Sequence, residues 1–261
     1  GNIKSGVPTI TTSLRGLVDG VIVVDQKMEP VHSGLGGGVV PDAFMILSRI
    51  ISSFHNDKGE LLIKGLTPTE QDVFELSDEF VKSSLSSTGV NLFEMDSYSK
   101  RLWLEPALSI LAIDAPPVAE SVNLLIPKAK AKVSLRLPPT EDPDHAMNML
   151  EQHIKENTPF NANVEFIPEA KGKGILVDPK NEFSSKLIES FNKHWENEVA
   201  YMGVGGSIPF ANVFINEFPN SEIVLVGAGD EEGNAHAPNE SVNISDIQRL
   251  IDSLTDAISN Y

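Results

Sequence analysis

Six histidines are the side chains in this sequence best suited to acid–base or metal chemistry. They are His32, His55, His145, His153, His194 and His236. No two of them form an H-x-H or H-E-x-x-H motif, so spacing alone predicts no complete metal site. His32 and His236 lie in Gly- or Pro-rich loops at strand ends, where functional residues concentrate. The other four lie on or beside predicted helices among charged residues, which favours solvated surface positions for most of them.

His32 precedes a run of glycines in VHSGLGGGVVP. It is either a turn residue before a flexible backbone bend, or an imidazole that donates to a ligand approaching the glycine backbone closely. The stretch lacks the G-x-x-x-x-G-K-[ST] motif, and its spacing is not G-x-G-x-x-G. It therefore does not predict a nucleotide site.

A second glycine turn occurs in GVGGSIPF, where Gly205 and Gly206 separate a predicted strand from a predicted helix. Ser207 is the predicted N-cap of that helix. Free backbone N–H groups at this point could hold a carboxylate or an oxyanion, and an ordinary capped helix fits equally well. The stretch is not the G-x-S-x-G nucleophile elbow, so a serine hydrolase is not predicted.

Two further residues could bind ligands. Arg136 lies near the end of the apolar strand AKAKVSLRL, 13 residues after Asn123. Its guanidinium could bind a carboxylate in bidentate fashion, although an internal salt bridge is the interpretation that the sequence alone favours. His236 follows an acidic loop and is a credible single metal ligand.

Composition limits the kind of partner. The 261 residues include 20 Lys and Arg against 37 Asp and Glu, a formal charge of -17 that disfavours nucleic acid as a partner. The chain has no cysteine, so a metal would be held by histidine and carboxylate, which suits zinc or manganese. The absence of cysteine also fits a cytoplasmic location. No apolar run reaches the ~20 residues that cross a bilayer, so no membrane association is expected.

The first two thirds of the chain predict an α+β domain. The predicted elements are a strand or hairpin at 9–26, a helix at 42–54 with Pro41 in its first turn, strands at 59–65, 107–115 and 129–137, a helix at 144–157 and a strand at 163–169. This order is the split βαβ pattern, a four-stranded antiparallel sheet with helices on one face. The acidic, Ser-rich segment 67–106 is predicted to be an insertion with a helix at 69–83.

The last third predicts an α/β arrangement. Helices are expected at 181–197, 208–218 and 244–258, and strands at 199–202 and 222–229. Two parallel strands cannot bury the apolar faces of three helices, because such sheets usually have about four to six strands. We therefore expect half a domain, whose other half precedes Gly1 in a parent protein or comes from another chain.

Five stretches together resemble one family closely. They are TTSLRG, VHSGLGGGVVPDA, NLLIPKAKAKVSLRLPP, GGSIPF and NAHAPNES. The chain resembles the di-zinc metallopeptidases that include carnosinase, aminoacylase, carboxypeptidase G and succinyl-diaminopimelate desuccinylase, and most of all the bacterial dipeptidases. The resemblance implies a zinc-binding α/β catalytic domain interrupted by a lid or dimerisation domain. Residues 1–9 would end the N-terminal catalytic segment, 10–170 would form the lid, and 171–261 the C-terminal part of the catalytic domain.

The resemblance also implies roles for three lid residues. His32 matches the histidine that reaches into the partner subunit's active site and stabilises the tetrahedral intermediate. Asn123 matches a polar residue near the substrate. Arg136 matches the arginine that binds the substrate carboxylate.

In the catalytic part, Gly205, Gly206 and Ser207 match the loop that contacts the C-terminal end of the substrate. His236 matches the one metal ligand of this half. The chain departs from the family at Gly203 and Val204, where many members have Arg-Glu, which removes one carboxylate-binding arginine. The family's H-x-D motif, bridging Asp, Glu-Glu pair and further Asp ligand normally lie N-terminal to the S-L-R-G strand, a region that this sequence does not include.

The resemblance therefore implies that the intact parent, with two zinc ions, hydrolyses an amide bond of a dipeptide or N-acyl amino acid with a free carboxylate. It also implies a homodimer formed through the lid. Amide hydrolysis needs a metal-activated water and a base, so we expect the isolated chain to bind no zinc tightly and to be inactive. The alternative is a non-catalytic dimerisation or interaction module. A nucleotide-binding enzyme is a third, disfavoured hypothesis.

Overall fold

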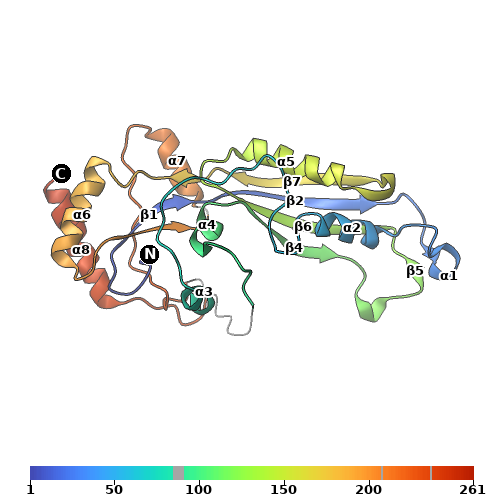
Figure 1. Ribbon diagram of the computed structural model, residues 1–261, viewed down its shortest axis with the longest axis horizontal. Helices are drawn as coiled ribbons and strands as arrows, with labels where there is room; N and C mark the ends of the chain where they lie inside the picture. The colour runs from blue at the N-terminus through green and yellow to red at the C-terminus, as the bar shows by residue number, and fades with distance from the viewer. Residues whose placement is uncertain (85–90, 207, 236) are drawn as a thin grey trace. The chain divides into compact units, whose positions relative to one another are not determined.

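The computed structural model describes residues 1–84, 91–206, 208–235 and 237–261 (Figure 1). The chain forms two compact units, and each is described by itself. Unit 1 contains Gly1–Arg15, Glu70–Leu104 and Gly174–Tyr261, and unit 2 contains Gly16–Thr69 and Glu105–Lys173. No helix in these described ranges is long and apolar enough to span a membrane.

Unit 2 is built on a four-stranded antiparallel sheet in the order β4-β6-β2-β7. Its elements are β2 (Gly16–Asp25), β3 (Val31–His32), α1 (Ser33–Gly36), α2 (Ala43–Ser52), β4 (Ala107–Asp114), η1 (Val118–Glu120), β5 (Leu124–Leu125), β6 (Lys128–Leu137), α5 (Pro143–Glu156), η2 (Pro159–Asn161) and β7 (Val164–Gly172). Helices α2 and α5 pack into the same apolar core as one face of the sheet. The predicted α+β class and split βαβ sheet are confirmed.

Alternation along the strands creates the core of unit 2. In β2 the buried residues Val18, Ile22 and Val24 alternate with half-buried ones, as expected for a sheet with one covered face. Asp42 caps α2 by accepting a hydrogen bond from Met45 N at 2.9 Å. Pro41 therefore precedes the cap, and its predicted place in the first turn is wrong.

Unit 1 is built on a three-stranded sheet in the order β8-β1-β9, in which β1 and β9 are parallel. Its elements are β1 (Thr9–Leu14), α3 (Asp78–Ser84), α4 (Tyr98–Trp103), β8 (Ile175–Leu176), α6 (Glu182–His194), β9 (Ala200–Val204), α7 (Pro209–Glu217) and α8 (Ile244–Ser259). Tyr201 packs with α6 and α8, whereas Met202 packs with Trp103. Because neighbouring strand residues face opposite sides, the sheet is covered on both faces.

Three predicted elements differ in the structure. Segment 59–65 forms no strand, because Gly59 and Gly65 have positive φ of 76° and 87° and turn the backbone. Segment 222–229 makes only one bridge, Leu225 to Thr11, since β8 occupies the same edge of β1 further along. The helix predicted at 69–83 is the shorter α3.

The compact units divide the chain differently from the predicted domain ranges 1–9, 10–170 and 171–261. The predicted insertion packs with unit 1, where Trp103 and Leu104 are buried beside Ile3. Segment 9–26 is neither a single strand nor a hairpin, because β1 and β2 belong to different sheets. The predicted domain ranges stay a prediction.

Candidate functional site

Two loops of unit 2 pair at one end of the sheet, and we call residues 26–43 and 115–127 together the tip. Strand β3 pairs antiparallel with β5 in the tip, with His32 opposite Leu124. Figure 1 shows α1 and β5 beside each other beyond the end of β2. The tip therefore holds His32 on a hydrogen-bonded backbone rather than on a free loop.

The His32 side chain has a defined orientation. Its Nδ1 accepts a hydrogen bond from Gly34 N at 3.0 Å. In the neutral imidazole the proton then lies on Nε2, and the exposed ring presents an N–H donor to solvent. A Cβ at Gly34 would lie 3.1 Å from Nδ1, so a larger residue would displace the ring. The geometry suits a hydrogen bond to a developing negative charge.

Asn123 lies beside His32 in the tip. Its carbonyl oxygen accepts a hydrogen bond from Ser33 N at 2.9 Å, directly after His32. Both residues are exposed. The structure thus brings these two predicted site residues together.

Arg136 lies far from the tip of its own unit. It is half-buried in β6 between Leu17 and Ala107 of the neighbouring strands, on the sheet face that α2 and α5 leave open. Lys128, at the tip end of β6, is eight residues away, which corresponds to about 26 Å of strand. No ion pair joins Arg136 to another described residue, so the internal salt bridge favoured from sequence is absent from that part of the chain.

The glycine turn after β9 is held by Arg15, which sequence reasoning missed. Arg15 is buried, and its Nε donates to Gly205 O at 3.3 Å. Its backbone N donates to Val204 O at 3.2 Å. The arginine of the S-L-R-G strand thus positions Gly205 and Gly206 in the structure. No local pattern in the sequence signals this contact, because the two residues are 190 positions apart.

Gly203 has a packing explanation. A Cβ at this position would lie 2.4 Å from Trp103 Cβ and 2.6 Å from Ser13 Oγ. Trp103 thus occupies the space that a side chain would need. A larger residue at position 203 would therefore require Trp103 or Ser13 to move.

Ser207 and His236 lie outside the described residues, so their predicted roles stay predictions. The helix that follows, α7, has Ile208 as its N-cap, with φ -118° and ψ 92° and no side-chain cap bond. The N-cap role predicted for Ser207 falls on a residue outside the described ranges. The helix begins at Pro209, whose fixed φ suits a first helical position.

The acidic loop that leads to His236 is tied to the start of the chain. Asn2 N donates to Gly229 O at 2.5 Å, and Ser5 N donates to Glu231 Oε2 at 3.0 Å. Glu231 is thus a hydrogen-bond acceptor rather than a purely solvated charge. The described residues contain no group of three or more His, Asp or Glu that could hold a metal ion.

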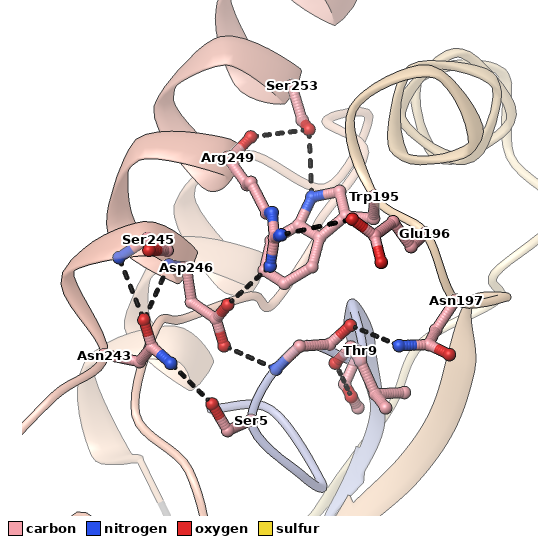
Figure 2. A network of polar contacts seen from close by, with 12 residues as sticks. Ser5, Thr9, Trp195, Glu196, Asn197, Asn243, Ser245, Asp246, Arg249 and Ser253 are labelled. Carbon is pink, nitrogen blue, oxygen red and sulfur yellow. Dashed lines mark hydrogen bonds and ion pairs between the residues drawn. The ribbon is translucent and has the colours of Figure 1, made fainter.

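A buried carboxylate anchors the same N-terminal loop (Figure 2). Asp246, in the first turn of α8, is fully buried, and its Oδ2 accepts a hydrogen bond from Gly6 N at 2.7 Å. Arg249 Nη1 lies 3.3 Å from Asp246 Oδ1. Asn243 Nδ2 donates to Ser5 Oγ at 2.7 Å. We call this network the polar clamp, and it fixes the approach of the chain to β1.

One of the other histidines is not a surface residue. His153 is buried on α5, with its ring stacked on Phe54 at 5.2 Å and Nε2 3.0 Å from Ser53 Oγ. Burial lowers the pKa of His153. His145 on the same helix is half exposed and contacts Glu141 at 2.7 Å. The surface interpretation fails for His153 because it completes the core between α2 and α5.

The fold defines a class of protein in which a split βαβ domain is inserted in the sequence of an α/β domain. The model of the peptidase dimerisation domain of the M20 peptidases matches residues 12–162. The chain belongs to this family.

Relatives match over nearly the whole chain. It is 31% identical over 260 residues to the cysteinylglycine-S-conjugate dipeptidase of Corynebacterium striatum, covering 96% of this chain and 56% of the relative. It is 26% identical over 262 residues to the Cys-Gly metallodipeptidase of Saccharomyces cerevisiae, covering 92% and 53%. The chain thus spans about half the length of the curated relatives it matches.

Solved structures share the fold. The S. cerevisiae dipeptidase Dug1p superposes with a TM-score of 0.77 at 22% identity, over 98% of this chain and 57% of that chain. Human carnosine dipeptidase 1 gives a TM-score of 0.77 at 19% identity, over 100% and 58%. The predicted family is confirmed.

Proposed function

We propose that this chain is the C-terminal part of a zinc-dependent dipeptidase or aminoacylase-like metallopeptidase. The intact parent hydrolyses an amide bond of a dipeptide or N-acyl amino acid with a free carboxylate, as a cytoplasmic homodimer with two zinc ions. The observation that carries the proposal is the 31% identity to a dipeptidase over 96% of this chain.

The chain's own residues bind and orient the substrate. Arg136 holds the substrate carboxylate, because a planar guanidinium donates two parallel hydrogen bonds to it. Gly205, Gly206 and Ser207 contact the same end. His32 donates from Nε2 to the oxygen on which negative charge develops. His236 would hold one metal ion in the parent, and bound zinc would supply an activated water there.

Distance within unit 2 supports action of His32 on a second copy. The tip and Arg136 are separated by about 26 Å of β6. A dipeptide is only about 7 Å long. One unit therefore cannot apply His32 and Arg136 to one substrate, whereas two copies can each supply one of them.

Complementation between inactive variants of the intact parent tests this proposal. His32→Ala should lower kcat by about 100-fold while leaving KM nearly unchanged, since the lost contact forms mainly in the transition state. His236→Ala should abolish activity through the metal site. Mixed dimers of the two variants should recover part of the activity, and mixtures that stay inactive would exclude action of His32 in trans.

A non-catalytic dimerisation or interaction module is the alternative, favoured by the dimerisation-domain match over 12–162. Translating the gene upstream of Gly1 separates the two. An H-x-D motif and a Glu-Glu pair there favour the peptidase, and their absence favours the module. Neither alternative involves nucleic acid or a membrane.

A further inference from the structure

A groove with a volume of about 740 Å³ lies in unit 2 between α5 and the chain that follows α2. Leu62 and Lys64 line it from the segment after α2, and Met149, His153 and Glu156 line it from α5. Binding sites for small molecules usually have volumes of about 300–1,000 Å³ and combine apolar walls with a few polar groups. The size and the mixed lining of the groove therefore suit a small ligand.

The two sides of the groove are held close together. Gly65 has a positive φ of 87°, and a Cβ there would lie 2.8 Å from Met149 Sδ, so the backbone passes close to α5. His153 is buried, and its Nε2 lies 3.1 Å from Ser53 O. Since a carbonyl oxygen only accepts, this contact fixes the ring with its proton on Nε2. A groove that is ordered in advance loses little conformational entropy when a ligand binds.

The groove carries one charge of each sign. In the described part of the chain, neither Lys64 nor Glu156 forms an ion pair. Burial is the main cause of the lowered pKa of His153, and among the nearby charges Glu156 raises this pKa whereas Lys64 lowers it. Both charges therefore lie near the same ring. A ligand that carries both an ammonium and a carboxylate group can pair with the two of them.

We propose that this groove binds an amino-acid zwitterion, either a free amino acid or a short peptide. Its carboxylate pairs with Lys64, its ammonium group pairs with Glu156, and an apolar side chain contacts Met149 and Leu62. The groove lies on the side of the sheet that α2 and α5 cover, whereas Arg136 lies on the open face. It is therefore separate from the substrate site of the proposed function and does not depend on that function.

Methyl NMR on the full chain tests the proposal. The chain has six methionines, and the signal that disappears in Met149→Leu identifies the methyl group in the groove. L-leucine should shift this signal with a dissociation constant of about 1 mM. Lys64→Met and Glu156→Gln should each raise that constant by at least about 10-fold.

Two matched variants and two analogues serve as controls. Lys58→Met and Glu151→Gln change exposed residues of the same two segments outside the groove lining, and they should leave the dissociation constant unchanged. Isocaproate lacks the ammonium group and isoamylamine lacks the carboxylate, so each should bind at least about 10-fold more weakly than L-leucine. Titration with Gly-Leu distinguishes the two sources, because the natural type of ligand binds more tightly.

Two results would overturn the proposal. The first is an unshifted Met149 signal with both L-leucine and Gly-Leu at about 30 mM. The second is a shift that is lost in Arg136→Ala and kept in Lys64→Met. That result would place the ligand at the substrate site, so it would exclude the groove while supporting the carboxylate-binding role of Arg136 in the proposed function.

Discussion

Unit 2 and unit 1 reach stability by different means. Unit 2 has one contiguous apolar core that joins both helices to the sheet. Unit 1 has three separate apolar clusters, and the polar clamp around Asp246 joins two of its three chain segments. Apolar side chains such as Phe210 on α7 and Ile244 on α8 stay exposed. The difference indicates that unit 2 is self-sufficient and that unit 1 depends on contacts between distant segments.

Fluorescence separates the two units. Both tryptophans, Trp103 and Trp195, and all three tyrosines lie in unit 1. Tryptophan emission therefore reports on unit 1 alone, whereas far-ultraviolet circular dichroism reports on both. We therefore expect tryptophan emission to change at a lower urea concentration than the circular dichroism signal.

The largest effect is expected when the C-terminal segment of unit 1 is produced without its N-terminal segment. Residues 171–261 lack β1, the middle strand of the sheet, so β8 and β9 have no partner. We expect this fragment to be unfolded by circular dichroism and NMR. Unit 2, with 70–104 replaced by a flexible linker, should fold cooperatively as the control. Stable folding of 171–261 alone would contradict the comparison.

The second largest effect is expected when a core side chain of unit 2 is shortened. Phe54 is fully buried, so Phe54→Ala should lower the free energy of unfolding of unit 2 by about 3–5 kcal/mol. Urea titration followed by circular dichroism measures it, and tryptophan emission should shift little. Phe160→Ala is the matched control, because Phe160 is exposed. Its ring lies 5.5 Å from the Arg49 guanidinium carbon, so its loss should lower the free energy of unfolding by less than about 1 kcal/mol. If both variants lost the same free energy of unfolding, a single buried core in unit 2 would be refuted.

Removing the centre of the polar clamp should affect unit 1 alone. Asp246→Ala leaves Gly6 N without its buried acceptor and should lower the free energy of unfolding of unit 1 by about 2–4 kcal/mol. Tryptophan emission detects it, since Arg249 lies 5.8 Å from the Trp195 ring. Asp252→Ala, at an exposed position of the same helix, should change stability by less than about 0.5 kcal/mol. If the polar clamp contributed no stability, the two variants would have the same free energy of unfolding.

The smallest effect is a pH dependence of unit 2. Because burial lowers the pKa of His153, the unfolded chain binds this proton at higher pH than the folded one. The stability contribution is complete above about pH 6.5 and is lost as the pH falls through the folded pKa. Urea titrations at pH 7 and 5 should show a smaller pH effect in His153→Gln and an unchanged one in His145→Gln. If the stability of His153→Gln depended on pH as strongly as that of the wild type, titratable groups other than His153 would cause the effect.

Regular periodicity made unit 2 predictable from sequence. The alternation in β2 and β6 and the helical spacing of α2 and α5 predicted the split βαβ sheet. Unit 1 was less predictable, because its central strand β1 precedes unit 2 in the chain while β8 and β9 follow it. A long-range pairing of this kind leaves no local pattern.

Site residues follow the same division. The glycine turn after His32 was predictable, because its local sequence favours a bend, whereas the role of His32 stays a prediction. Arg15 was not, since its contact with Gly205 joins residues 190 positions apart. The burial of His153 likewise depends on Ser53, 100 positions away, and no local pattern encodes it.

The central proposal is that this chain carries substrate-binding residues of a metallopeptidase and does not hydrolyse the substrate on its own. The most direct measurement is hydrolysis of a dipeptide by the purified 261-residue chain with zinc added. The account predicts no turnover above the uncatalysed rate. Zinc-dependent turnover that a chelator abolishes would contradict it.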